Sequence, residues 1–515
     1  MPETAAKPNI LIAVADDWSF GHAGAYGCQW VKTPNFDKVA KEGILFTNTY
    51  TPNAKCAPSR AALLTGRNSW QLEGAGNHQS VFPTKFKTYP EALAEVGYRI
   101  GYTAKGWAPG VAFNIDGSPR ELLGKGYSDR LLDPPTPEIS NINYAANFQA
   151  FLDHSAGKQP WCFWYGSKEP HRGYNFRSGV RLGGKSLHDI DRIPQYWPDT
   201  ENVRHDLLDY ALEVEHFDRQ LGLMIQTLVQ RGELENTLLI ALSDNGMPFP
   251  RVKGQGYDHS NHLPMAIRWG HGIAKPGRIV ADFISFIDLA PTIIEAAHLD
   301  WEESGLSPTP GKSLMPLFQS EKEGEIDPDR NRVLIGKEKH DVGRPGNVGY
   351  PIRGIVTESH LYLKNFKPQR WPAGNPETGY LNCDGSPTKT EILKLRTDPE
   401  KAHFWTLSFG KRPEEELYDL QADPDCMRNL ANDPSYSKIK DGLRHQLIAE
   451  LIEQGDPRFV GDNPDIFDTY PIFEERWENF HERYLKGEAP VPRWIRPTDP
   501  DPSFIETEGS QAETH

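Results

Sequence analysis

The most informative segment of the chain begins with a cysteine. Residues 56–67 read Cys-Ala-Pro-Ser-Arg-Ala-Ala-Leu-Leu-Thr-Gly-Arg. Pro58 suits the first turn of a helix and Gly66 its end, so Cys56 is expected at the amino terminus of that helix. Free N–H groups there carry partial positive charge, and an anion beside Cys56 would be stabilised, with Arg60 one turn further on. An isolated cysteine is more often structural, but this complete pattern predicts a reactive group beside an anion site.

Two pairs of oxygen-bearing side chains each follow a short apolar run. Asp16 and Asp17 form one pair, and Asp244 and Asn245 form the other. Three carboxylates and one amide suit calcium or magnesium better than zinc. Either pair alone could be solvated loop residues or helix caps. Together with the cysteine segment, they predict a site for a hard divalent cation.

Buried strands and helices are expected to position these residues. The apolar run that begins at residue 8 and the run at 237–243 are typical of parallel strands buried on both faces. Helical patterns lie at 34–42, 89–96 and 206–232. This alternation predicts an α/β fold with a large, mostly parallel sheet. Both polar pairs then stand at carboxyl ends of strands, where they can meet.

The pattern changes near residue 350, which predicts two domains. Residues 1–350 form the catalytic α/β domain, and residues 351–515 form a smaller α+β domain with an irregular tail after Gln454. The second part has strand-like pieces at 352–356, 360–365 and 416–420, followed by a helix that includes Leu447.

Composition excludes several classes of protein. The 515 residues carry a net charge of −15, which opposes binding to nucleic acid or anionic lipid. No apolar stretch approaches the roughly 20 residues of a membrane span, and residues 1–8 lack the apolar region of a signal peptide. Five cysteines without a CxxC pair indicate neither a zinc site nor a disulfide framework.

The cysteine segment resembles the signature CxPSRxxxLTGR of the type I sulfatases. Every fixed position is matched, by Cys56, Pro58, Ser59, Arg60, Leu64, Thr65, Gly66 and Arg67. Four further segments resemble the sulfamidase branch, the N-sulfoglucosamine sulfohydrolases: residues 243–250, 285–293, 311–314 and 416–420. The resemblance spans nearly the whole chain and implies an alkaline phosphatase-like fold.

The resemblance implies two cofactors. A maturation enzyme would oxidise Cys56 to formylglycine, whose hydrated aldehyde attacks sulfur with one hydroxyl and expels sulfate by using the other. A plain thiol lacks that second group. The family also places one calcium ion on the positions that match Asp16, Asp17, Asp244 and Asn245 here.

Further catalytic residues follow from the same resemblance. Lys105 and Lys253 match family cations that hold the sulfate together with Arg60, although Lys253 stands where some relatives have arginine. His171 matches the histidine that protonates the leaving group, a task suited to an imidazole.

One position departs from the family pattern. Many sulfatases carry a histidine where this chain has Trp107, and His78 is the replacement candidate. Trp107 either forms a wall on which a sugar stacks or belongs to the core.

Substrate contacts are assigned from position alone to Arg172, Glu338, His340 and Arg344, with a solvated charged loop as the alternative interpretation. The turn-rich segment 379–387 either overhangs the pocket or is a surface loop.

These observations predict a sulfatase that acts on a terminal sulfated sugar, with N-sulfoglucosamine of heparan as first choice. The alternatives are an exo-acting O-sulfatase on another polysaccharide, such as a marine algal one, a phosphoester hydrolase of the same superfamily, and a non-catalytic sugar-binding relative. The expected partners are the sulfated saccharide and the maturation enzyme, without nucleic acid or membrane. A homodimer is compatible with this interpretation. A periplasmic or secreted location is expected, with a signal peptide already removed.

Overall fold

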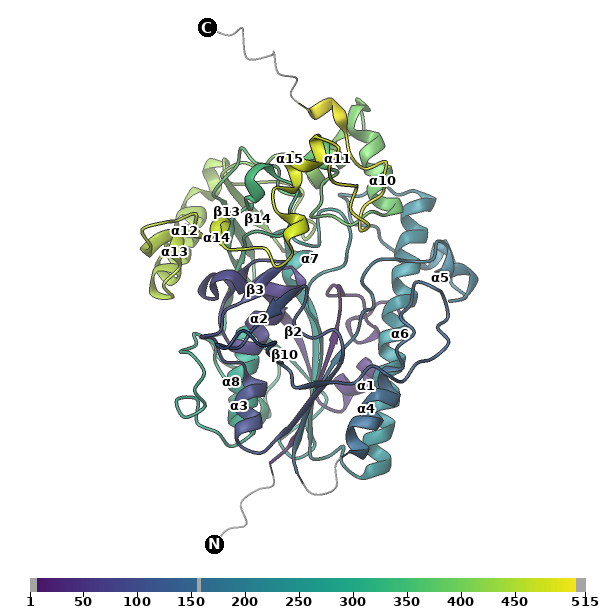
Figure 1. The fold of residues 1–515 in the computed structure, drawn as a ribbon, viewed down its shortest axis with the longest axis vertical. Helices are drawn as coiled ribbons and strands as arrows, with labels where there is room; N and C mark the ends of the chain where they lie inside the picture. Colours follow the sequence, from purple (N-terminus) through teal and green to yellow (C-terminus); the bar gives the residue numbers. More distant parts are fainter. Residues whose placement is uncertain (1–6, 155–158, 506–515) are drawn as a thin grey trace.

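A computed structural model describes residues 7–154 and 159–505, and Figure 1 shows its fold. An eight-stranded sheet has the order β10-β2-β9-β8-β1-β7-β4-β6. Its strands are β1 (Asn9–Ala15), β2 (Ile44–Tyr50), β4 (Arg99–Ala104), β6 (Lys125–Gly126), β7 (Trp161–Gly166), β8 (Thr237–Ser243), β9 (His262–Arg268) and β10 (Arg278–Ser285). Strand β9 runs antiparallel to its two neighbours and the other pairs are parallel, which confirms the mostly parallel sheet.

Helices cover both faces of this sheet, as Figure 1 shows. Leu11 and Ala13 of β1 face one apolar core, whereas Ile10 and Ile12 face the other, because successive side chains of a strand point to opposite sides. The first core is covered by α1 (Pro34–Lys41), α4 (Tyr144–Asp153) and α6 (Glu201–Arg231), and the second by α2 (Cys56–Thr65), α3 (Tyr89–Glu95) and α8 (Leu289–Ala296). Burial on both faces explains the continuous apolar runs in the sequence.

The longest helix, α6, begins earlier than the sequence pattern indicates. It starts at Glu201 rather than at residue 206, because the hydroxyl of Thr200 accepts a hydrogen bond from Val203 N at 3.3 Å and caps the helix.

Both polar pairs lie at the carboxyl ends of strands of the large sheet. Asp16 follows β1 and Asp244 follows β8, and these two strands are paired directly. Helix α2 begins at Cys56, after β2 and a short loop, and ends before Gly66, whose φ of 69° provides a left-handed cap. The sheet therefore brings the cysteine segment and both polar pairs to one edge.

A second, antiparallel sheet has the order β11-β12-β13-β14. Its strands are β11 (Arg332–Lys337), β12 (Ile352–Thr357), β13 (His360–Asn365) and β14 (Glu415–Asp419). Helix α12 (Ser437–Glu453) packs Leu447 and Leu451 against this sheet. Strand β11 also meets the loop before α2, where Gly336 N donates to Pro52 O at 2.7 Å. This contact ties the second sheet to the cysteine segment, while the domain boundary at residue 350 stays a prediction.

The remaining elements are short. A two-stranded sheet joins β3 (Ser80–Phe82) and β5 (Gly110–Ala112). The other helices are α5 (Ser178–Arg181), α7 (Asp258–Asn261), α9 (Met315–Gln319), α10 (Pro387–Lys394), α11 (Ala402–Phe409), α13 (Pro457–Val460), α14 (Ile466–Thr469) and α15 (Phe480–Leu485). From residue 455 to residue 505 the chain is mainly irregular, interrupted by three of these helices. Among the described residues, no helix has the length and apolarity that crossing a bilayer demands.

Candidate active site

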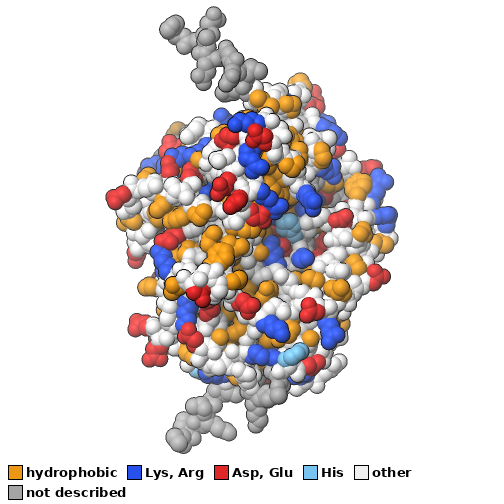
Figure 2. All heavy atoms as spheres, in the orientation of Figure 1, with side chains coloured by type: hydrophobic (Ala, Val, Ile, Leu, Met, Phe, Trp, Pro, Cys, Tyr) orange, Lys and Arg blue, Asp and Glu red, His pale blue; other side chains and the backbone are white. Residues whose placement is uncertain are grey.

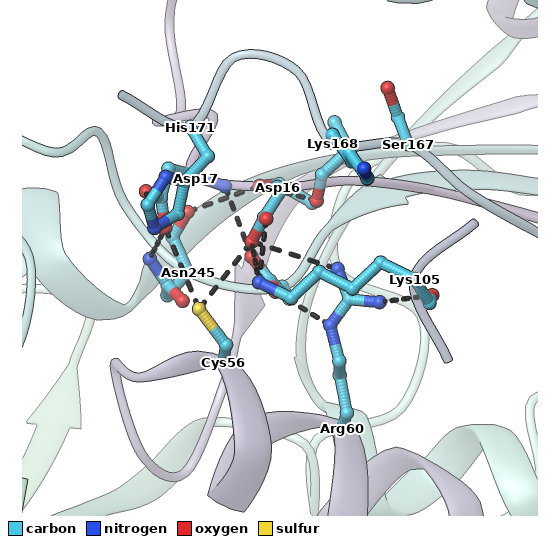
Figure 3. A network of polar contacts seen from close by, with 12 residues as sticks. Asp16, Asp17, Cys56, Arg60, Lys105, Ser167, Lys168, His171 and Asn245 are labelled. Atoms are coloured by element: carbon cyan, nitrogen blue, oxygen red, sulfur yellow. Dashed lines mark hydrogen bonds and ion pairs between the residues drawn. The ribbon is translucent and has the colours of Figure 1, made fainter. Parts of the chain in front are cut away.

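Cys56 lies at the amino terminus of α2 and lines a cavity of about 450 Å³. Its Sγ is 3.4 Å from Asp16 Oδ1 and 4.0 Å from Asp17 Oδ1 (Figure 3). Figure 2 shows a hollow near the middle of this face of the molecule, where a histidine and several Lys or Arg side chains are visible. The thiol therefore lies beside the acidic pair and opens onto a cavity.

The unmodified thiol is a poor nucleophile in this environment. Burial raises the pKa of Cys56 to about 12, and the negative charge of Asp16 adds to the effect. Because the thiolate is the reactive form, the cysteine is inert near neutral pH. Position 56 is better suited to a nucleophile made by modification of the cysteine side chain than to the thiol itself.

Four oxygen-bearing side chains converge beside Cys56. Asp17 N donates to Asp244 Oδ1 at 3.0 Å, and Asn245 Nδ2 donates to Asp17 Oδ1 at 2.6 Å. Carboxylate oxygens of Asp16 and Asp17 and the sulfur of Cys56 lie within 4.8 Å of one another. Asp17 has a φ of 78°, an uncommon conformation for aspartate that the surrounding hydrogen bonds hold. The two distant polar pairs thus form one cluster.

This cluster fits a hard divalent cation. Asn245 is fully buried, and its Oδ1 has no hydrogen-bond partner among the described residues. A buried acceptor without a partner is costly, and a bound cation would satisfy it. Oxygen donors from three carboxylates and an amide are the ligand set that calcium and magnesium prefer.

Three cations surround the acids, as Figure 3 shows in part. Arg60 is fully buried, with Nε 2.8 Å from Asp244 Oδ2. Lys105 Nζ is 2.6 Å from Asp16 Oδ2, and Lys253 Nζ is 2.6 Å from Asp17 Oδ2. These positive groups converge where the sequence predicted an anion site.

The charge of Lys105 is secured by its partner. Burial is the largest single influence and would lower its pKa, but Asp16 and the other nearby acidic groups together outweigh burial and raise the pKa to about 12. For Lys253 burial is again the largest single influence, but Asp17, Asp384 and the other nearby acidic groups together raise the pKa well above its usual value. Both ammonium groups are therefore charged at every physiological pH.

His171 reaches the same cluster from the loop after β7. Its Nδ1 is 2.7 Å from the carbonyl oxygen of Arg172, and its Nε2 is 3.9 Å from Asp17 Oδ2. The side chain is about one-third exposed, at 32%, and lines the cavity. One ring nitrogen is thus fixed by the backbone, while the other faces the site.

Two more of the residues named from the sequence, His78 and His340, line the cavity. His340 Nε2 is 2.6 Å from Asn53 Oδ1, and Nδ1 of each histidine has no hydrogen-bond partner among the described residues. Burial is the main cause that holds the pKa of both histidines well below the usual value, and nearby lysines add to it. Both rings are therefore neutral at physiological pH.

Three other residues named as substrate contacts are held by internal ion pairs. Arg172 is paired with Asp206 and lines a neighbouring cavity of about 560 Å³. Glu338 and Arg344 are 0% and 1% exposed. Glu338 is paired with Arg353 and Arg458, and Arg344 with Asp341. Glu338 and Arg344 do not line either cavity, so their geometry favours a role in holding the chain together.

Trp107 packs in the core beneath the site rather than on the wall of the cavity. It is 8% exposed, its Nε1 donates to Ala57 O at 2.9 Å, and its ring meets Phe82 edge-on at 5.1 Å. The indole therefore supports the first turn of α2 from below.

Replacing Trp107 by alanine is expected to destabilise the protein by about 3–5 kcal/mol, because it leaves a cavity and removes the hydrogen bond to Ala57 O. Denaturant unfolding measures this change, and Trp107→Phe, which keeps most of the volume, should cost less. An unchanged unfolding free energy in Trp107→Ala would contradict the supporting role.

Several residues that line the cavity are not among those predicted from the sequence to form the site. Lys55 precedes Cys56, and Leu381, Asp384 and Trp494 come from the carboxyl-terminal third. The turn-rich segment 379–387 does overhang the cavity, through Leu381 and Asp384. Lys55 is recognisable in the sequence as a cation beside Cys56, and Leu381 and Asp384 lie in the turn-rich segment, whereas no local signal marks Trp494.

Comparisons with known proteins agree with this geometry. A family model named Sulfatase matches residues 8–299, which is more than half of the chain. Human N-sulphoglucosamine sulphohydrolase is 28% identical over 482 residues, covering 88% of this chain and 91% of that protein. An ulvan-active sulfatase of Formosa agariphila is 28% identical over 458 residues, covering 87% of this chain and 81% of that protein.

The fold is also found among solved structures. One is described as a protein in complex with its substrate D-glucosamine-2-N,6-O-disulfate, and it matches with a TM-score of 0.59 at 20% identity. The match covers 89% of this chain and 99% of that chain. With its family match and the residues gathered around Cys56, the chain belongs to the sulfatase family of sulfuric ester hydrolases.

Proposed function

We propose that the mature protein removes sulfate from a terminal sulfated sugar, with N-sulfoglucosamine of heparan-type glycans as the first candidate. One observation carries the proposal: Cys56 opens onto a cavity beside an acidic cluster, with Lys105 and Lys253 in contact with that cluster. The similarity to human N-sulphoglucosamine sulphohydrolase supports the choice of sugar. The ulvan-active relative supports the alternative of an O-sulfatase on an algal polysaccharide.

Formylglycine derived from Cys56 is the proposed nucleophile. Its hydrated form supplies one hydroxyl to attack sulfur and a second that allows sulfate to leave. The high pKa of the unmodified thiol supports this assignment, because the thiol itself would not attack at neutral pH. A formylglycine-generating enzyme is therefore a required partner, and a periplasmic or secreted location is proposed with it.

The acidic cluster is the proposed calcium site. Its ligands are Asp16, Asp17, Asp244 and Asn245, and the ion would offset negative charge on the sulfate oxygens. Asn245 Oδ1, which has no hydrogen-bond partner in the described part of the chain, supports this assignment.

The charged side chains have separate tasks in this proposal. Lys105 and Lys253 hold the sulfate oxygens, because each carries a secured positive charge at the cavity. Arg60, which is fully buried, holds Asp244 and Asp16 in place rather than meeting solvent. His171 presents Nε2 toward the site and donates a proton to the leaving group.

Replacing His171 by alanine is expected to lower kcat for a sulfated saccharide by about 10²–10⁴-fold. An aryl sulfate should lose much less, because its phenolate leaves without protonation. Steady-state rates on both substrates measure the difference, and His188→Ala, at an exposed position, is the matched control. Equal losses on the two substrates would refute the proton-donor role.

A sulfate-release panel tests the function as a whole. The mature enzyme is offered N-sulfoglucosamine, glucosamine 6-O-sulfate, sulfated ulvan oligosaccharides and an aryl phosphate. Preferred release from N-sulfoglucosamine supports the first candidate, and preferred release from ulvan oligosaccharides supports the alternative. Turnover of the phosphate alone would overturn the proposal in favour of a phosphoester hydrolase.

A further inference from the structure

The outer wall of the cavity is built by two segments far apart in the sequence. Leu381 and Asp384 belong to the turn-rich segment 379–387, and Trp494 belongs to the irregular carboxyl-terminal chain. Figure 1 shows this terminal chain, in yellow, beside α10 and α11 above the large sheet. We call the side chains of Leu381, Asp384 and Trp494 the outer wall.

Trp494 is held in place by contacts that leave its ring at the cavity. Its Nε1 donates to Leu381 O at 2.9 Å, and its carbonyl oxygen accepts from Gly385 N at 2.7 Å. The indole meets Trp477 edge-on at a centroid distance of 5.0 Å. Trp494 is partly exposed although its polar atom is already satisfied. Its contribution to the cavity is therefore an apolar, flat and preorganised surface.

Polar contacts through α10 connect the two segments: Lys389 Nζ donates to Gly379 O and Cys383 O at 2.8 Å each, and the same lysine is paired with the terminal chain. Lys389 Nζ is 3.0 Å from Asp499 Oδ2, and these side chains are 0% and 1% exposed. Arg496 donates to Thr390 Oγ1 at 2.9 Å. Breaking a buried ion pair is costly, so the terminal chain is a fixed part of the wall.

Asp384 adds a carboxylate to this wall. Its Oδ2 is 3.1 Å from Lys253 Nζ, and it lies close to Asp17 and His171, with ligand atoms within 4.8 Å of one another. A carboxylate has acceptor oxygens only, and Asp384 lines the cavity, so it is suited to accept a hydrogen bond from a hydroxyl or N–H group of a ligand.

The combination matches the chemistry of a sugar ring. A pyranose has an apolar face of C–H groups, which packs on an indole, and a rim of hydroxyl donors, which seek acceptors. The cavity of about 450 Å³ lies within the roughly 300–1,000 Å³ range of small-molecule pockets. His78 and His340 line the same cavity.

We propose that the outer wall is a saccharide subsite in which Trp494 stacks on the sugar ring and Asp384 accepts a hydrogen bond from the ring. This inference rests on the proposed sulfatase function and deepens it, because it assigns recognition of the sugar to the terminal chain. In the proposed function Lys105 and Lys253 hold the sulfate, so stacking of Trp494 on the ring is a separate contact, whereas Asp384 lies next to Lys253.

The test compares binding of the ring with binding of sulfate in the mature enzyme. Trp494→Ala should raise KM for the best sulfated saccharide about tenfold, while inhibition by inorganic sulfate changes less than about twofold. Trp494→Phe should recover most of the loss, because it keeps an aromatic face. Arg493→Ala, at an exposed neighbouring position, is the matched control and should behave as wild type.

Two results would overturn the inference. One is a KM for Trp494→Ala within about twofold of wild type. The other is an equal loss of affinity for the saccharide and for inorganic sulfate, which would indicate a general disturbance of the site. Asp384→Asn should weaken binding of the saccharide more than it weakens binding of a ring analogue that lacks hydroxyl groups. An equal loss of affinity for both ligands would remove Asp384 from the subsite.

A binding measurement separates this inference from the proposed function. Titration calorimetry of the unmatured protein with N-sulfoglucosamine needs no turnover. If the mature enzyme releases no sulfate, binding that depends on Trp494 still supports the subsite while the catalytic proposal fails. If the mature enzyme turns over but binding does not depend on Trp494, the catalytic proposal stands and the subsite is overturned.

Discussion

Replacing Cys56 by serine is expected to abolish sulfate release, with kcat/KM at least about 10⁴-fold below the mature wild-type enzyme. The variant cannot be oxidised to the aldehyde by the route proposed for cysteine, so the second hydroxyl that expels sulfate is lost. Cys56 is 1% exposed, and its sulfur contacts Asp16, so serine fits the same space with little effect on folding. Steady-state kinetics on an aryl sulfate and on N-sulfoglucosamine measure the loss.

Cys28→Ser is the matched control, because Cys28 is a half-buried free thiol outside the cavity. It should keep wild-type activity. Mass spectrometry of the wild-type Cys56 peptide should show that one sulfur and two hydrogens have been replaced by one oxygen. An unmodified thiol together with full activity would refute the aldehyde mechanism, and an unmodified thiol without activity would favour a sugar-binding protein.

The gathering of Cys56 and the two polar pairs at one edge of the sheet could be predicted because it depends on short local patterns. The helix start at Cys56 and the strand ends before Asp16 and Asp244 are properties of consecutive residues. A parallel sheet then forces such strand ends to one edge, as the direct pairing of β1 and β8 shows. Sequence and fold therefore agree wherever a motif lies inside a regular element.

The cavity wall could not be predicted in the same way. Asp384 and Trp494 lie in irregular chain, where no periodicity indicates which side chains point inward. Their positions depend on long-range contacts, such as the one between Lys389 and Asp499. These contacts form between segments about a hundred residues apart, and no local pattern encodes them.

Local sequence patterns also did not predict which side chains near the strand ends are buried. Trp107 follows Lys105 closely, yet Lys105 points to the acidic cluster and Trp107 packs beneath α2. Glu338 and Arg344 look like a charged loop in the sequence, but the structure buries each beside an opposite charge. A charged residue near a strand end is thus a weak guide to substrate contact.

Removing the proposed calcium ion, or one of its proposed ligands, is expected to lower activity by about 10³-fold. A metal ion at a sulfate site stabilises the transition state by several kcal/mol, and each 1.36 kcal/mol corresponds to about tenfold in rate. Treatment with a chelator should cause this loss in the wild-type enzyme, and added calcium should restore the rate. Asp17→Asn should show the same loss without recovery, because Asp17 lies at the centre of the acidic cluster and supplies a carboxylate that asparagine lacks.

Thermal unfolding gives a second readout that does not depend on turnover. Calcium at about 100 times its dissociation constant should stabilise the wild-type protein by about 2.7 kcal/mol, whereas Asp17→Asn should gain much less. Asp129→Asn, at an exposed position, should respond as wild type. Full activity after exhaustive chelation, with no stabilisation by added calcium, would show that the acidic cluster serves only to hold Lys105 and Lys253. The two readouts together separate a metal site from an ion-pair network, because a network loses nothing to a chelator.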